Sequence, residues 1–317
     1  MQTGNSLELN KNYIIVTISL IINMDKNLFK DKLENNEFVY TSEVSPERGT
    51  DLSKIKIILK SLKDKITAFN VTDNQGANMK MSSLAASIYI KSIGGEPIFQ
   101  QTCRDRNRMA LESDLLGASA LGINNVLTLT GDYITFGDHK HAKPVYDIDS
   151  VNLIEIIKGL NSGYDMNGNH LNGKTDFYIG AAVNPESNPL EPQLMKFEKK
   201  IKAGCNFFQT QAVFSVENFE KFYNYYKNYN NIKIIAGIFI LKSAKVARFM
   251  NKNIPGIYIP QSIVDELENS KDPLKTGIEI SARVAKGLKN KVNGLHIMAF
   301  GIEDSIPNFL KNFEEEE

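Results

Sequence analysis

The sequence predicts a protein of the α/β class, folded as a single (β/α)8 TIM barrel with a helix leading into it at the N-terminus. Strand patterns and helix patterns alternate eight times with no repeated low-complexity linker, and this alternation is typical of parallel α/β folds. The 317 residues would suit either one large barrel or two ordinary domains. Neither a GxGxxG turn nor a GxxxxGKS/T loop supports two nucleotide-binding domains. We therefore expect residues 24–317 to form one barrel domain.

Residues 1–23 are expected to be an N-terminal extension, with Met24 as the natural start of the protein. The apolar run at residues 13–22 is too short to cross a bilayer, and no small-residue cleavage site of the usual kind follows it. Residues 24–33 have helical spacing with Asp25 in the N-cap position. They predict the helix that leads into the barrel.

The composition favours a small-molecule partner over a nucleic acid or a membrane. The 37 basic and 37 acidic residues cancel, so no overall field attracts nucleic acid or an anionic lipid surface. The two cysteines, Cys103 and Cys205, are too few for a disulfide framework or a metal site. This cysteine usage favours a reducing compartment and predicts a cytoplasmic protein.

The eight βα units follow one another in order along the chain. Apolar or alternating runs predict strands at residues 38–44, 66–71, 97–101, 125–132, 177–183, 205–210, 232–238 and 294–300. Helical spacing predicts helices at residues 52–63, 82–93, 109–121, 150–160, 191–203, 216–226, 243–251 and 302–313, with further helical segments between residues 251 and 289. The loop at residues 133–149 is unusually long, and loops of this length are often functional.

Polar residues gather where the predicted strands end. In a TIM barrel these ends meet at one mouth, where catalytic residues lie. The set comprises Glu43, Thr72, Asp73, Asn74, Gln100, Gln101, Asp132, Asn184, Gln209 and Gln211. Glu43 would be suited to act as a general acid if it is partly buried, and an ion pair with Arg48 or another cation is the alternative. Asp132 follows Gly131, which allows close approach of a ligand, and the alternative for Asp132 is a helix cap.

Two charged segments have competing interpretations. The cluster at residues 104–108 contains Arg104, Arg106 and Arg108. These arginines could bind a phosphate or diphosphate beside a helix N-terminus, or they could pair with neighbouring carboxylates on a solvated helix cap. His139 and His141 stand two residues apart, but no carboxylate or cysteine joins them at a recognised spacing. No metal site is predicted there.

The order of several short segments resembles the methylenetetrahydrofolate reductase family over about residues 37–300. The matching segments are TSEVSPERG at 41–49, VTDN at 71–74, GAN at 76–78, QTCRD at 101–105, LLGA at 115–118, GINNV at 122–126, LTGD at 129–132, GAAVNPE at 180–186, KKIKAGC at 199–205, TQ at 210–211 and AGIF at 236–239. Each segment is weak by itself, whereas their order and spacing are specific.

The resemblance implies a flavoprotein oxidoreductase of one-carbon metabolism and methionine biosynthesis. Such an enzyme transfers a hydride from reduced flavin to 5,10-methylenetetrahydrofolate and forms 5-methyltetrahydrofolate. By motif position, Glu43 resembles the general acid and Asp132 the carboxylate near flavin and pterin, while Gln211 and Phe239 match folate contacts. The flavin-contacting positions are Thr72, Gln101, Thr130, Gly131, Asp132, Tyr146 and Lys200.

Two departures from the family pattern concern the cofactor and the electron donor. Gln101 stands where many members carry histidine, and Gln193 stands where an aspartate would meet the adenosine of FAD. FAD is the expected cofactor, with FMN as the alternative. The segment after Thr102 resembles the branch from anaerobic bacteria, in which partner subunits can supply electrons. The donor is therefore NADH or such a subunit, and homo- and hetero-oligomers both remain open.

Two other functions are compatible with the same barrel. One is a folate-binding methyltransferase that uses a corrinoid or another methyl acceptor and needs no flavin. The other is a subunit that binds flavin or folate but depends on a partner for turnover.

Overall fold

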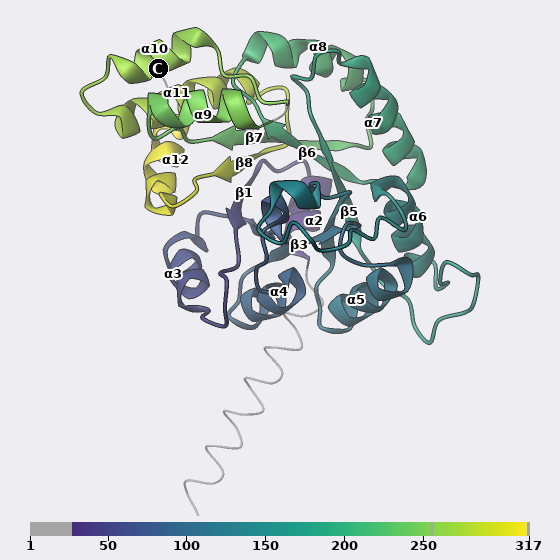
Figure 1. The fold of residues 1–317 in the computed structure, drawn as a ribbon. Helices are drawn as coiled ribbons and strands as arrows, with labels where there is room; N and C mark the ends of the chain where they lie inside the picture. The colour runs from purple at the N-terminus through teal and green to yellow at the C-terminus, as the bar shows by residue number, and fades with distance from the viewer. Residues whose placement is uncertain (1–26, 255, 316–317) are drawn as a thin grey trace, which may run out of the picture.

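Eight parallel strands close into a barrel in the computed structural model, which describes residues 27–254 and 256–315 (Figure 1). Each strand pairs with the next in the chain, and β8 closes the ring against β1. The strands are Val39–Val44 (β1), Ala68–Val71 (β2), Pro97–Thr102 (β3), Asn125–Leu129 (β4), Tyr178–Val183 (β5), Phe207–Ala212 (β6), Lys233–Phe239 (β7) and Gly294–Met298 (β8). The predicted TIM barrel is confirmed.

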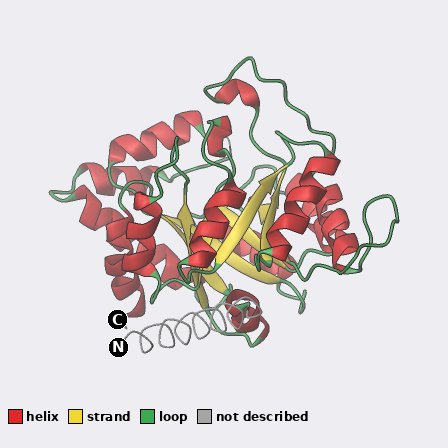
Figure 2. Cartoon of the chain, turned by 90° about the horizontal axis from the view of Figure 1, so that it is seen from below, coloured by secondary structure: helices red, strands yellow, loops and turns green. Residues whose placement is uncertain are grey.

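Helices surround the barrel and connect successive strands (Figure 2). They are Ser53–Leu62 (α3), Ser83–Ser92 (α4), Arg108–Ala120 (α5), Ser150–Asn161 (α6), Glu191–Ala203 (α7), Val216–Tyr226 (α8), Ala244–Asn253 (α9), Gln261–Glu268 (α10), Pro273–Leu288 (α11) and Ile306–Glu314 (α12). Short 3-10 turns occur at Gln75–Ala77 (η1), Ile134–Phe136 (η2) and Glu303–Ser305 (η3). The connection from β7 to β8 contains three helices, α9 to α11, where the sequence predicted a run of helical segments.

The boundaries of four predicted strands are corrected by two or three residues. The second strand begins at Ala68, the fourth ends at Leu129 and the last ends at Met298. The sixth strand begins at Phe207 and ends at Ala212, two residues later than predicted. The side chain of Asn206, just before it, accepts from the backbone N–H of Ile179 at 2.8 Å. The new end of the sixth strand includes Gln211 in β6.

The helix that leads into the barrel is Leu28–Glu34 (α2), and it closes the amino-terminal end of the barrel. Its N-cap is Asn27, whose side chain accepts from the backbone N–H of Lys30 at 3.0 Å. The predicted cap, Asp25, and the predicted extension at residues 1–23 lie outside the described residues. Phe29 and Leu33 are fully buried. They pack against an inward-facing lower layer formed by Val39, Ala68, Ile98, Leu127, Tyr178, Phe207 and Ile235.

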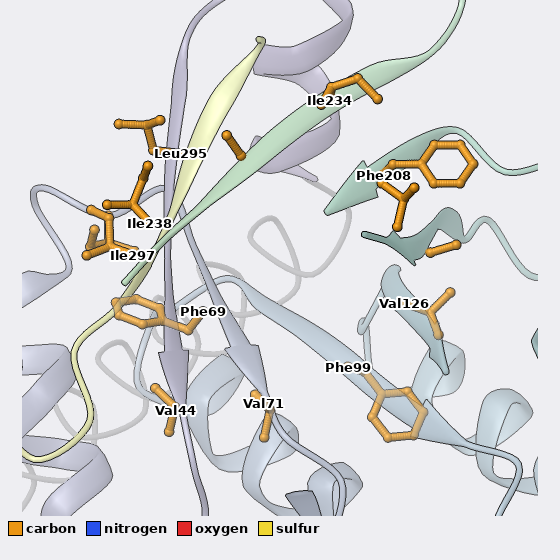
Figure 3. Packing of buried hydrophobic residues seen from close by; sticks show 14 of the residues in the cluster. Val44, Phe69, Val71, Phe99, Val126, Phe208, Ile234, Ile238, Leu295 and Ile297 are labelled. Carbon is orange, nitrogen blue, oxygen red and sulfur yellow. The ribbon is translucent and has the colours of Figure 1, made fainter. Parts of the chain in front are cut away.

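The other face of each strand packs against the helices. Figure 3 shows part of this outer core, with side chains from β1, β2, β3, β4, β6, β7 and β8. Val44, Phe69 and Phe99 belong to it, and each is buried. Because side chains alternate along a strand, the residues next to these, such as Glu43 and Asn70, point into the barrel. The lower half of that interior is apolar, and the upper half carries the polar groups.

Candidate functional site

A buried polar layer lies above the apolar layer inside the barrel. Asn70 on β2 donates through Nδ2 to Oε1 of Gln209 on β6 at 2.6 Å. The same Nδ2 lies 2.9 Å from Nδ1 of His296 on β8, and Oγ1 of Thr41 on β1 lies 3.0 Å from that nitrogen. All four side chains are buried. This network joins four strands and forms the floor of the candidate site.

Glu43 lies above this floor, two residues beyond Thr41 on the same face of β1. Its side chain is only 8% exposed, and its Oε2 lies 3.7 Å from Nε2 of His296. Oε1 of Glu43, Oγ1 of Thr72 and Nε2 of His296 are buried with no hydrogen-bond partner in the described part of the chain. Unpartnered buried polar atoms are costly unless a ligand or water satisfies them. Three such atoms on β1, β8 and the end of β2 are groups that a ligand bound in the barrel could satisfy.

Of the alternatives for Glu43, an ion pair with Arg48 does not form. Arg48 pairs instead with Asp138 in the long loop after β4. Glu43 therefore keeps one carboxylate oxygen free of any protein partner among the residues described. A nearly buried carboxyl group with a free oxygen can deliver or accept a proton.

Asp132 lies beside the same mouth, just beyond the end of β4, and its side chain is exposed. Its Oδ2 accepts from the backbone N–H of Gly76 at 2.9 Å, and its main-chain oxygen accepts from the hydroxyl of Tyr146 at 2.9 Å. The next helix, α6, is capped by Asp149, which accepts from two backbone N–H groups at 2.8 and 3.0 Å. Asp132 is thus not the cap of that helix, and its carboxylate is held over the mouth by a main-chain donor.

Gly131 is required by both its conformation and its surroundings. Its φ is +94°, and a Cβ at this position would lie 2.9 Å from Cβ of Arg104. Any other residue would be strained and would push this side chain away. Neighbouring Thr130 is exposed, and its hydroxyl donates to Oγ of Ser150 at 3.3 Å. Position 131 therefore has no room for a side chain, because Arg104 and Thr102 fill the space beside its Cα.

The arginines that follow β3 are paired with carboxylates. Arg104 is buried and donates to both oxygens of Asp105 at 2.8 Å. Although burial raises the pKa of Asp105, hydrogen bonds from Arg104 and Asn74 hold that pKa below its usual value. Arg106 donates to both oxygens of Asp73 at 2.8 and 3.1 Å.

The third arginine of the cluster is paired in the same way. Arg108 binds Asp147 through its Nε and Nη2 atoms at 2.8 and 2.9 Å. The geometry therefore favours the self-paired interpretation of the cluster over a phosphate site.

Gln101 lies behind the barrel wall and not at the mouth. Its side chain is fully buried and donates to the main-chain oxygen of Leu111 on α5 at 3.1 Å. Because neighbouring residues on a strand face opposite ways, the inward position belongs to Gln100. The expectation that the Gln101 side chain lines the mouth is corrected.

Three further residues predicted for the site lie on α7, β6 and β7. Lys200 on α7 donates through Nζ to the main-chain oxygen of Ala182 on β5 at 2.7 Å, and burial lowers its pKa. Gln211 is the exposed position of β6, beside an irregularity in its pairing with β7. Phe239 ends β7, with its ring centroid 5.7 Å from that of Phe300.

The family model of methylenetetrahydrofolate reductase matches residues 28–314. The chain belongs to the methylenetetrahydrofolate reductase family. Methylenetetrahydrofolate reductase 2 of Schizosaccharomyces pombe is 25% identical over 315 residues, which is 89% of this chain and 46% of that protein. The 5,10-methylenetetrahydrofolate reductase of Buchnera aphidicola from Acyrthosiphon pisum is 25% identical over 280 residues, which is 84% of this chain and 88% of that protein. The chain thus spans about half the length of the first relative and most of the second.

A solved structure with the same fold comes from Clostridium thermocellum. It superposes with a TM-score of 0.65 at 18% identity and covers 90% of this chain and 97% of its own. That protein is described as binding two copies of 5-methyl-5,6,7,8-tetrahydrofolic acid. At this level of identity the likeness establishes the fold alone.

Sequence reasoning missed the buried partner of Glu43. His296 is the central residue of β8, in the segment Gly294–Met298, and its neighbours in the strand are apolar. A polar side chain at an alternate position of such a strand indicates the inward face of a barrel, and this signal could have identified His296. Of the other family positions, Glu43, Thr72 and Asp132 lie at the carboxyl ends of β1, β2 and β4.

The described residues contain neither a cluster of metal-binding side chains nor a membrane-spanning helix. Within residues 27–254 and 256–315, no group of three or more His, Cys, Asp or Glu side chains could hold a metal ion. His139 contacts Asp138 at 2.8 Å. Among the helices described, none is long and apolar enough to cross a membrane.

Proposed function

We propose that this protein is a flavin-dependent reductase that converts 5,10-methylenetetrahydrofolate to 5-methyltetrahydrofolate in one-carbon metabolism. The observation that carries the proposal is Glu43, a nearly buried carboxyl group with one free oxygen at the carboxyl end of the first strand. It stands at the position that the family resemblance gives to the proton donor. Family membership over residues 28–314 supports the same assignment, and the folate ligand described for the Clostridium thermocellum protein is consistent with it.

Two carboxylates would have different roles in the reaction of the folate. Glu43 would donate a proton as the five-membered ring of the substrate opens to a cationic iminium, because its carboxyl group is nearly buried and is not engaged by a close protein partner among the residues described. Asp132 would favour that cation through a fixed negative charge, since Gly76 holds its carboxylate in place. Gln211 would hydrogen-bond the folate through its amide, and Phe239 would pack against it.

The residues present fit a flavin at the same mouth. Thr72 has a buried hydroxyl without a partner among the residues described, and Gly131 presents no side chain at the end of β4. Tyr146 and Lys200 hold the neighbouring backbone through hydrogen bonds to Asp132 and Ala182. When bound, the flavin supplies the hydride that the substrate accepts.

FAD is the proposed form of the flavin on the family resemblance, with FMN as the alternative. The paired state of Arg104, Arg106 and Arg108 removes the most obvious cationic groups for a diphosphate. Mass spectrometry of the flavin released from the denatured protein distinguishes FAD from FMN. The proposed electron donor is NADH or a partner subunit that delivers electrons to the flavin.

The function is tested first by the visible spectrum of the purified protein. An absorbance band at about 450 nm is expected for bound oxidised flavin. Anaerobic addition of NADH, or of dithionite if NADH fails, should bleach the band, and 5,10-methylenetetrahydrofolate should then restore it. A protein that binds no flavin, even when flavin is supplied, would contradict the reductase function and leave the methyltransferase as the better explanation. Bleaching by dithionite but not by NADH would support the partner subunit.

A further inference from the structure

We propose that His296 is a positioning residue for Glu43, which it holds through a proton on Nε2. The carboxylate oxygen nearest to Nε2 is Oε2, and the other oxygen, Oε1, is buried without a partner among the residues described. This inference rests on the proposed function, because it gives Glu43 the role of proton donor. His296 itself does not reach the mouth, since its side chain is fully buried.

The hydrogen bonds around His296 assign its proton. Asn70 directs the same Nδ2 toward Oε1 of Gln209 at 2.6 Å and toward Nδ1 of His296 at 2.9 Å. An amide nitrogen only donates, and a carbonyl oxygen only accepts. Nδ1 of His296 is therefore the acceptor, which leaves the proton of the neutral ring on Nε2. That nitrogen is the one that faces Glu43.

The surroundings favour a functional use of this proton over simple packing. Nε2 of His296 and Oε1 of Glu43 are both buried without a hydrogen-bond partner among the residues described. An apolar side chain would fill the same space without this cost. The separation of 3.7 Å between Nε2 and Oε2 is longer than a hydrogen bond. Pairs of this kind commonly tighten only when substrate is bound.

The assignment can be tested without measuring any activity. The chain contains four histidines, so selective labelling with 15N-histidine gives a simple NMR spectrum, and the variant His296→Gln identifies the signals of His296. We expect a protonated, pyrrole-type Nε2 and an unprotonated, pyridine-type Nδ1. A pyridine-type Nε2 would overturn the proposal, because that nitrogen could not donate to Glu43.

The second test compares two variants of His296 in the two half-reactions. His296→Phe fills the site but has no donor, whereas His296→Gln keeps an amide N–H. Reoxidation of the reduced flavin by methylenetetrahydrofolate should slow by about a hundredfold in His296→Phe, which is the size expected when a catalytic group is misplaced. His296→Gln should retain most of the rate. Flavin content and reduction by dithionite should be unchanged in both.

The control and the outcomes separate this inference from the proposed function. His170→Gln changes a histidine that packs on Tyr164 in the loop after α6, and it should leave both half-reactions unchanged. Equal slowing by Phe and Gln at position 296, or no slowing by Phe, would overturn the positioning role. If the wild-type protein itself is not reoxidised by the folate, the proposed function fails, while the NMR result still decides where the proton of His296 lies.

Discussion

The two halves of the barrel interior differ in the polarity of the side chains that fill them. In the lower half, Phe29, Tyr178 and Phe207 form a cluster of rings with centroids 5.2 to 6.2 Å apart, and apolar side chains fill the space around them. In the upper half, Glu43 and His296 are buried with unpartnered polar atoms. The lower half therefore stabilises the fold, and the upper half gives up stability to hold groups ready for a ligand.

The largest expected effect comes from removing the free carboxyl group of the upper half. Glu43→Gln should slow reoxidation by methylenetetrahydrofolate by about a hundredfold to ten-thousandfold, because an amide cannot serve as a general acid. Flavin binding and reduction by an artificial donor should remain, as followed by absorbance under anaerobic conditions. The matched control is Glu47→Gln in the loop that follows β1, where Glu47 pairs with Lys54 at 3.1 Å. Unchanged turnover of the folate in Glu43→Gln would remove Glu43 from the mechanism.

The next largest effect comes from the lower half and should affect stability without changing chemistry. Phe207→Ala should lower the free energy of unfolding by about 3 to 5 kcal/mol, because a fully buried ring is replaced by a cavity. Phe136→Ala is the control, since Phe136 is 65% exposed in the loop after β4, and we expect a change of less than about 0.5 kcal/mol. Denaturant unfolding measures both. An equal loss in the two variants would contradict the division between the halves.

The lower half and the helical surface were the most predictable parts of the sequence. The helix boundaries at α7 and α8 agree with the prediction to the residue, because apolar residues at helical spacing report directly on burial. The start of β6 was misplaced because Cys205 is buried close to the apolar Phe207 and Phe208, although the side chain of Asn206 between them bonds to the backbone of the neighbouring strand. The spacing of apolar residues indicates which side chains are buried. It does not show at which residue the backbone hydrogen bonds of a strand begin or end.

The upper half was predictable in its residue types but less so in its directions. Glu43 and Asp132 were expected at the mouth, and the structure brings both there. Gln101 was expected beside them, yet a difference of one residue turns its side chain toward α5. His296 was not singled out because its partner Glu43 lies more than 250 positions earlier in the chain, and only the closure of β8 on β1 brings them together.

A smaller effect concerns the pH dependence of stability at the two ends of the barrel. Glu96 lies at the amino end, where it accepts from Asn125 at 2.8 Å, and Glu186 lies near the start of α8, where it accepts from the backbone N–H of Ser215 at 2.8 Å. Burial raises the pKa of each carboxyl group from 4.5 to about 7. A raised pKa means that the folded state binds the proton more tightly than the unfolded state.

The resulting stabilisation is complete below about pH 4.5 and is lost as the pH rises through about 7. Between these values the free energy of unfolding should fall by an amount on the order of 3 kcal/mol for each group. Glu96→Gln and Glu186→Gln should each make that pH dependence shallower, as measured by denaturant unfolding at several pH values. If the free energy of unfolding depends on pH as steeply in both variants as in the wild-type protein, groups other than Glu96 and Glu186 take up the protons.

The smallest effect expected at the mouth comes from a single hydroxyl group. Tyr146 has a φ of +42°, and its hydroxyl donates to the main-chain oxygens of Asp132 and Gly131 at 2.9 and 3.4 Å. Burial raises its pKa, so the hydroxyl keeps its proton and remains a donor at neutral pH. Tyr146→Phe removes only these two bonds. The loop at the end of β4 should become less ordered while the lower half of the barrel is unaffected.

We therefore expect Tyr146→Phe to weaken flavin binding by about twofold to tenfold, because the bond at 2.9 Å contributes about 0.5 to 1.5 kcal/mol and the bond at 3.4 Å adds little. Titration of the apoprotein with flavin measures this change, and denaturant unfolding of the apoprotein should show almost none. Tyr133→Phe is the control, because Tyr133 lies in the same loop and is 69% exposed. If Tyr146→Phe instead lowers stability and leaves flavin affinity intact, the loop belongs to the stabilising part of the molecule, and the boundary between the two halves lies above the end of β4.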